Sequence, residues 1–172
     1  MALDKQADAL QFLMDDHEKI QDLFDEFEDT DDVDARRQIC ETVRNELTAH
    51  TMIEEEIFYP AVRAEIDDDD LLDEAEEEHH LATMLLNELE NMSPDDEHYV
   101  AKFTVLADSV RHHIREEEEE MFPQVKKSDL DLEHLGAQMD ARKQELLREI
   151  RSATPYVREQ GRPEAASWRD DL

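Results

Sequence analysis

Two short stretches of the sequence each place a glutamate four residues after a histidine. They are HTMIEEEIFYPAV, which begins at His50, and HIREEEEEMFPQV, which begins at His113. Residues four apart on a helix stack on one face, so His50 can meet Glu54 and His113 can meet Glu117. Imidazole and carboxylate without thiolate suit iron, manganese or zinc, and two bridging carboxylates suit a pair of metal ions. The spacing therefore indicates two halves of one metal centre.

The elements that must position these residues are predicted to be the helices of an all-α, up-down-up-down four-helix bundle. Apolar residues recur three and four positions apart along four long segments, as the inward faces of bundle helices require. Ser93 is expected to cap the fourth helix, with Pro94 at its first position. The four helices are predicted at about 4–28, 34–64, 71–90 and 94–123, followed by a short fifth helix that starts near Ser128. The predicted organisation is a bundle over 1–127, a helical extension over 128–153 and a flexible tail over 154–172.

Each of the four bundle helices carries one histidine on its apolar face. A lone histidine among leucines is more often a hydrogen-bonded core residue than a ligand, but one histidine per helix favours a shared site. Two carboxylates in the same core would cost several kcal/mol unless cations compensate them. The competing interpretation is a structural bundle with no physiological metal or with adventitious zinc. The predicted metal ligands are His17, His50, Glu54, His79, His113 and Glu117.

Register decides between neighbouring candidates. On the third helix the apolar face selects His79 over His80, which is rotated by about 100°. After each of the two glutamates we expect the three- and four-residue spacing of buried positions to continue along the helix. It places Ile57 and Ala61 on the buried face after Glu54, and Glu120 after Glu117. The long glutamate runs are expected to be mostly solvated. His98 and His134 are expected on the surface.

Composition and charge exclude several classes of function. Acidic residues outnumber Lys and Arg by 49 to 18, for a net charge of −31, which disfavours contacts with nucleic-acid phosphates. No apolar run reaches the roughly 18 residues of a membrane span, and the N-terminus lacks the pattern of a signal peptide. We therefore expect a cytoplasmic protein. Its dense acidic charge is better tolerated where salt screens it, which leads us to expect the cytoplasm of a halophile. Cys40 is expected to be a small core residue.

These residues resemble the hemerythrin-like proteins with an HHE cation-binding domain. The match consists of His17, H-x-x-x-E followed by IFYP, EEH in the third helix, and H-x-x-x-E followed by MFP. It covers roughly residues 8–125, and LEHLGAQMDARK is similar to a C-terminal segment of bacterial and archaeal members. The resemblance implies a non-haem di-iron centre with two iron ions bridged by Glu54, Glu117 and an oxo or hydroxo group. His17 and His50 would serve one iron, and His79 and His113 the other.

The sequence also departs from the oxygen-carrying hemerythrins. These have a further histidine four residues from the third-helix ligand, where this chain has Ala75 and Thr83, and an aspartate five residues after the fourth-helix histidine. One iron would therefore have a place for water, His80, Glu76 or Tyr59. The function expected from the resemblance is binding of O2, NO or peroxide, or sensing of iron or oxygen. The alternative is a di-iron enzyme with catalase-like or oxidase activity. Protein partners and the oligomeric state stay open.

Overall fold

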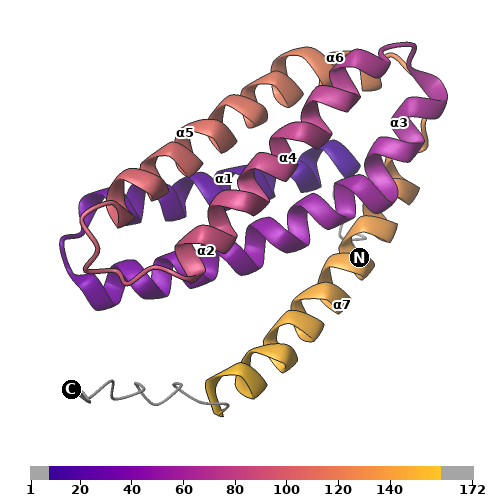
Figure 1. The fold of residues 1–172 in the computed structure, drawn as a ribbon. Helices are drawn as coiled ribbons and strands as arrows, with labels where there is room; N and C mark the ends of the chain where they lie inside the picture. The colour runs from indigo at the N-terminus through magenta and orange to yellow at the C-terminus, as the bar shows by residue number, and fades with distance from the viewer. Residues whose placement is uncertain (1–7, 160–172) are drawn as a thin grey trace, which may run out of the picture.

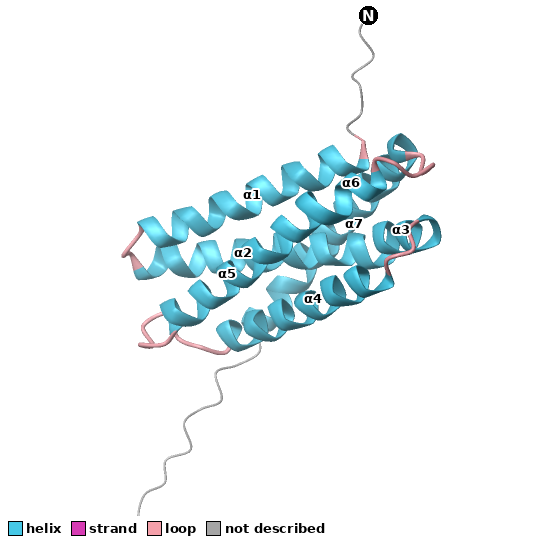
Figure 2. Ribbon diagram, turned by 90° about the horizontal axis from the view of Figure 1, so that it is seen from above, coloured by secondary structure: helices cyan, strands magenta, loops and turns pink. Residues whose placement is uncertain are grey.

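Four long helices lie side by side in the computed structural model, which describes residues 8–159 (Figure 1). Within that range the chain is helical without a strand, as the view from above also shows (Figure 2). The all-α bundle prediction is confirmed. The elements are α1 (Ala9–Asp29), α2 (Val33–Ile53), η1 (Glu54–Phe58), α3 (Tyr59–Glu65), α4 (Asp69–Glu90), α5 (Tyr99–Glu116), η2 (Glu117–Met121), α6 (Phe122–Val125) and α7 (Leu132–Glu159).

Aspartate caps fix where the first two helices begin. The Asp8 carboxylate accepts the backbone N–H of Gln11 at 3.0 Å, and the Asp32 carboxylate accepts that of Ala35 at 2.7 Å. Each cap satisfies a backbone donor that has no partner inside the helix. The short turn between α1 and α2 then makes them antiparallel neighbours.

The buried apolar residues form two clusters at successive levels of the bundle. One contains Leu13, Ile53 and Phe58, and the other contains Phe24 and Phe103. On α1, α2 and α4 the predicted ligand histidine lies between residues of the two clusters, and His113 of α5 lies between Val110 of the second cluster and Met121 of the first. The polar side chains are therefore enclosed by apolar layers on both sides, where water is scarce and charge is poorly screened. Cys40 lies in the second cluster and is buried, as expected.

Two π-helical turns, η1 and η2, interrupt the second and fourth bundle helices. The backbone N–H of Tyr59 donates to the carbonyl of Glu54, and that of Phe122 donates to Glu117, five residues back in each case. A proline follows each turn, Pro60 in the first turn of α3 and the matching proline in α6. Proline lacks an N–H and is tolerated where a helix begins anew. Single π turns of this kind are frequent at functional sites.

The π turns make part of the predicted register wrong. Glu120 was expected on the buried face but is exposed, and Met121 is buried instead. Ile57 and Ala61 are only half-buried, whereas Phe58 lies in the core. An extra residue in the turn moves every later side chain by one position around the helix. The expected spacing assumed an uninterrupted 3.6-residue period.

Two helix boundaries also differ from those predicted. Ser93 does not cap the fourth helix: α5 begins at Tyr99, because residues 93–98 form successive turns in which Asp96 accepts the His98 N–H at 2.8 Å. The fifth helix is not short, since α7 begins at Leu132, not near residue 128, and continues past 153 to Glu159. It packs against α1, α2 and η1. Most of the predicted flexible tail, residues 160–172, lies outside the described residues.

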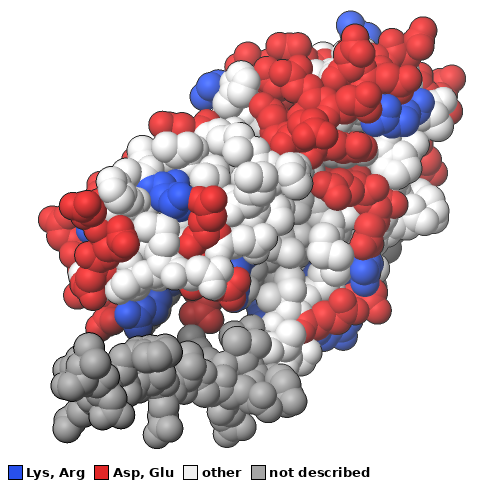
Figure 3. Space-filling model, in the orientation of Figure 1, with Lys and Arg blue, Asp and Glu red and all other residues white. Residues whose placement is uncertain are grey.

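Acidic side chains cover much of the visible surface, with a dense group near the end where α4 begins and α6 lies (Figure 3). His98 and His134 are exposed, as expected. Among the described helices, none combines the length and the apolar character needed to cross a membrane.

Candidate metal centre

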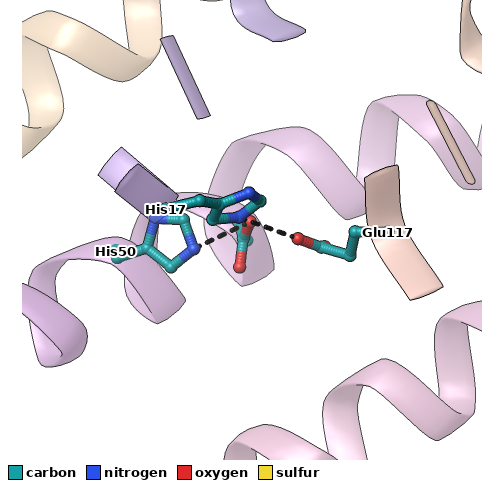
Figure 4. A group of neighbouring side chains, drawn as sticks. His17, His50 and Glu117 are labelled. Carbon is teal, nitrogen blue, oxygen red and sulfur yellow. Dashed lines mark ion pairs between the residues drawn. The ribbon is translucent and has the colours of Figure 1, made fainter. Parts of the chain in front are cut away.

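The six predicted ligands come together at the middle of the bundle. All six residues are buried, none more than 5% exposed. His17 Nε2 lies 3.2 Å from Glu117 Oε2, and His50 Nε2 lies 3.2 Å from Glu54 Oε1. Figure 4 shows the His17 and His50 rings close together, with Glu117 reaching them from another helix. Side chains from four helices thus meet at one point.

The donor atoms fall into two overlapping groups, in each of which they lie within 4.8 Å of one another. One group contains His17, His50, Glu54 and Glu117, and the other contains Glu54, His79 and His113. Glu54 belongs to both, with Oε1 toward His50 and Oε2 3.1 Å from His79 Nε2. Glu117 also reaches both sides, since its Oε2 lies 3.6 Å from His113 Nε2. The geometry matches two adjacent cation positions with shared carboxylates.

A second layer of carboxylates holds the outer nitrogen of each histidine. In the first half, Asp16 Oδ2 lies 3.3 Å from His50 Nδ1, and Glu118 Oε1 lies 2.8 Å from His17 Nδ1. A carboxylate at Nδ1 keeps a proton there and turns Nε2 inward as the ligating nitrogen.

The second half repeats this arrangement. Glu78 Oε2 lies 2.8 Å from His113 Nδ1, and Glu55 Oε1 lies 2.9 Å from His79 Nδ1. In both halves, one carboxylate directly precedes a predicted ligand histidine and the other directly follows a predicted ligand glutamate. The site is therefore built twice from the same local pattern.

Tyr59 breaks the symmetry between the halves. Its hydroxyl donates to Glu117 Oε1 at 2.7 Å and lies 3.2 Å from His79 Nε2. The equivalent residue of the other half, Phe122, stacks on His17 and offers no oxygen. Of the other side chains considered for the open position, His80 and Glu76 are exposed. The hydroxyl oxygen of Tyr59 is therefore available beside His79, on the side where α4 lacks a second histidine.

The buried donor atoms test whether a metal would fit. His17 Nε2, His50 Nε2, Glu54 Oε1 and Glu117 Oε2 are buried without a well-aligned hydrogen bond in the described structure, although their ion-pair contacts are as short as 3.2 Å. His79 Nε2 and His113 Nε2 lie 3.1 Å apart. Unsatisfied buried polar atoms are rare because each costs about 1–3 kcal/mol. Two divalent cations would satisfy all of these atoms together, so the residues fit the group.

Without metal, the site holds protons in place of cations. Burial lowers the pKa of His50, but Glu54 and Asp16 outweigh burial and raise that pKa to about 9. Burial opposes protonation of His79 too, yet Glu54 and Glu55 raise its pKa to about 10. Burial would raise the pKa of Glu54, but His50 and His79 hold it well below its ordinary value. The metal-free centre at neutral pH therefore contains imidazolium cations against a carboxylate.

These pKa shifts predict how pH affects the metal-free protein. His50 and His79 have folded pKa values above the ordinary 6.5. Their stabilisation is fully present below about pH 6.5 and is lost as the pH rises through 9 and 10. We expect the thermal midpoint of the metal-free protein to fall between pH 7 and 10 in a calorimetric series.

Metal binding provides the control for these protonation states, because an imidazolium must lose a proton before its nitrogen can bind a metal ion. Loading at pH 7 should release about two protons per chain from these histidines in a weakly buffered titration. A metal-free midpoint that stays constant up to pH 10, or loading without proton release, would contradict the assigned protonation states.

Sequence reasoning missed the second-layer carboxylates Asp16, Glu55, Glu78 and Glu118. They sit in acidic runs that look solvated, and Glu55 is indeed largely exposed. A signal was nevertheless present in the DH and EH dipeptides at His17 and His79 and in the residue after each ligand glutamate.

A four-helix bundle with histidines and carboxylates from every helix defines a class of metal-binding helical proteins. The sequence matches the family described as Hemerythrin HHE cation binding domain over residues 8–125. The chain belongs to this hemerythrin family, and its His/Glu clusters could bind metal.

Two further proteins are similar to this chain. One is a crystal structure of a Hemerythrin HHE cation binding domain-containing protein, the Rv2633c homolog from Mycobacterium kansasii. It has a TM-score of 0.74 and 27% identity and covers 91% of this chain and 95% of that chain. The other is a DNA nickase from Nostoc sp. (strain PCC 7120 / SAG 25.82 / UTEX 2576), 32% identical over 114 residues. The match covers 64% of this chain but only 31% of the nickase, so the chain spans about a third of that relative's length.

Proposed function

We propose that this protein binds two iron ions between Glu54 and Glu117. His17 and His50 would hold one ion, and His79 and His113 the other. The observation that carries the proposal is the set of buried nitrogen and oxygen atoms that face one another without well-aligned hydrogen bonds. Their donor types suit iron without requiring thiolate. Tyr59 would complete the second position through its hydroxyl oxygen.

The proposed centre would serve a small ligand such as O2, NO or peroxide. When bound, two adjacent irons supply electron transfer to or from such a molecule. A cavity of about 10 Å³ lies beside the centre, and its lining includes His50, His79 and His113 together with apolar and polar residues of α1, α2, α4 and α5. This volume accommodates about one water-sized molecule. This small volume argues against a large organic substrate at this side of the centre.

The protein's own residues would hold and protect this chemistry. Asp16, Glu118, Glu55 and Glu78 keep the outer histidine nitrogens protonated, so the inner nitrogens stay directed at the centre. Phe122 and Phe58 exclude water from the end of the site near the π turns. Tyr59 can hold a proton at its hydroxyl, or release that proton and become a phenolate. Burial and the charges of Glu117 and Glu54 raise the pKa of Tyr59 well above 10, so the phenol is neutral before loading.

A second candidate function is a di-iron enzyme with catalase-like or oxidase activity. The observation that favours it is the Tyr59 hydroxyl, which lies 3.2 Å from His79 Nε2 on the side where α4 lacks a second histidine. An anionic oxygen donor stabilises ferric over ferrous iron, which suits turnover of peroxide better than reversible O2 carriage. The DNA nickase is a different protein, and the region that it shares with this chain forms only 31% of its length. The net charge of −31 on this chain disfavours binding DNA.

Anaerobic loading with ferrous iron tests the proposal. We expect about two irons per chain by metal analysis after desalting, and a change in visible absorption on addition of O2, NO or peroxide. Sustained O2 release from peroxide, with two peroxides consumed per O2, would favour the enzyme. Iron content near zero after loading would reject both candidates.

A further inference from the structure

Lys143 of α7 is a buried cation outside the matched family region, which ends at residue 125. Its side chain is about 8% exposed. The ammonium group is ion-paired with Asp16, lies 3.5 Å from Glu46 Oε2, and sits 5.8 Å from the centre of the Phe12 ring. A buried ammonium is costly unless it is paired, so this position is specified by its partners.

Asp16 connects this cation to the metal centre. One carboxylate oxygen meets Lys143, and the other lies 3.3 Å from His50 Nδ1. The inner nitrogen of His50 in turn faces Glu54 at 3.2 Å. A direct chain of contacts therefore runs from α7 through Asp16 to a proposed metal ligand.

The other half of the site has a different basic side chain at the equivalent place. Glu78 holds His113 Nδ1 through one oxygen, while its other oxygen lies 3.7 Å from Nε2 of His112. The His112 side chain is 53% exposed and also lies 3.2 Å from Glu116. The first half thus has a buried lysine that is ion-paired with its carboxylate, and the second has a solvent-accessible imidazole.

We infer that Lys143 is a positioning residue that holds Asp16 and sets the donor strength of His50, making the two halves of the metal centre inequivalent. The inference rests on the proposed metal centre. A cation on a carboxylate weakens the pull of that carboxylate on an imidazole N–H, so His50 is a weaker electron donor than it would be beside an unpaired Asp16. The same cation fixes the Asp16 rotamer. α7 is on this account part of the metal centre as well as a cover for the bundle.

Lys143→Met, which keeps the length and apolar stem of the side chain, tests this inference, with Lys143→Arg retaining the charge. Removal of an outer-layer partner commonly costs about 10- to 100-fold in metal affinity. We expect a loss near the lower end of that range for Lys143→Met in competition titrations with ferrous iron, because Asp16 is no longer fixed and holds the His50 ring less well, and this outweighs the stronger donation of His50. We also expect a lower midpoint potential, because a positive charge near the centre is gone. Lys143→Arg should restore both values most of the way to wild type.

Leu146→Ala is the matched control, because it loosens a buried contact of α7 without changing charge. It should lower the thermal midpoint and leave the midpoint potential unchanged. Equal shifts of the potential in Leu146→Ala and Lys143→Met would show that Lys143 acts only through packing, and would overturn the inference. Wild-type affinity and potential in Lys143→Met would overturn it as well.

NMR of the metal-free protein separates this inference from the proposed function. The Nδ1–H resonance of His50 should shift or broaden in Lys143→Met, while that of His113, held by Glu78, stays in place. If wild type takes up no iron, the proposed function fails, yet this comparison still decides whether Lys143 controls His50. Unchanged His50 resonances would refute the link.

Discussion

Glu54→Ala is expected to lose most of the iron from the loaded protein. Glu54 contributes one oxygen toward His50 and the other toward His79, so its removal weakens both proposed metal positions. The variant also leaves two imidazolium groups without their shared carboxylate in the metal-free state. Breaking a buried ion pair in this way costs about 3–5 kcal/mol. Metal analysis after anaerobic loading and chemical denaturation measure the two effects.

A shape-matched variant and a surface control make this result specific. Glu54→Gln keeps the volume and removes the charge, and we expect it to lose iron as well. Glu119→Ala changes an exposed glutamate of η2 and should keep wild-type iron content. Full iron retention in Glu54→Ala would remove Glu54 from the proposed ligands.

Tyr59→Phe is expected to change both the metal-free and the loaded protein. Without metal, Glu117 Oε1 loses its 2.7 Å hydrogen-bond donor. Loss of a buried hydrogen bond to a charged group costs about 1.5–3 kcal/mol. In the loaded protein, the iron near His79 loses its proposed oxygen donor, so ferric iron should be bound more weakly. Visible absorption due to phenolate coordination should disappear.

Tyr99→Phe is the matched control for this substitution. Tyr99 is also buried, but it packs beside Phe27 in the apolar cluster away from the proposed ligands. We expect the Tyr99 variant to keep the wild-type spectrum and iron content. An unchanged spectrum in Tyr59→Phe would show that the hydroxyl is not coordinated, leaving Tyr59 only its hydrogen bond to Glu117.

The helices and the convergence of the predicted ligands could be read from the sequence because they depend on short-range spacing. The helix α4 shows this dependence on spacing best, since every residue that the sequence assigned to its buried face is buried, including His79. The spacing of His50 and Glu54 was also sufficient, because His50 lies before the π turn and Glu54 is its first residue. Their use as metal ligands stays a proposal.

The π turns could not be read from periodicity, and they decide the role of Tyr59. In a regular α-helix the residue above Glu54 on the same face would be Phe58, four positions on. The five-residue turn brings Tyr59 over Glu54 instead, which carries its hydroxyl toward Glu117 and His79. Sequence reasoning therefore left Tyr59 among several alternatives.

Lys143 was hidden for a different reason. It lies on a helix whose charged residues alternate with apolar ones, and such lysines are mostly solvated. Its burial follows from the way α7 packs across α1 and α2, next to Asp16 and Glu46. Contacts between residues so far apart in the sequence leave no mark in local spacing. The predicted division into a 1–127 bundle and a separate extension stays untested, and the Lys143 contacts argue for treating α7 together with the bundle.

Anomalous X-ray diffraction from crystals of the iron-loaded protein tests the central claim most directly. The account predicts two iron peaks per chain, both beside Glu54 and Glu117. One should lie against His17 and His50, and the other against His79, His113 and Tyr59. A single peak, or iron bound only at a surface group such as Glu78, His112 and Glu116, would contradict the account.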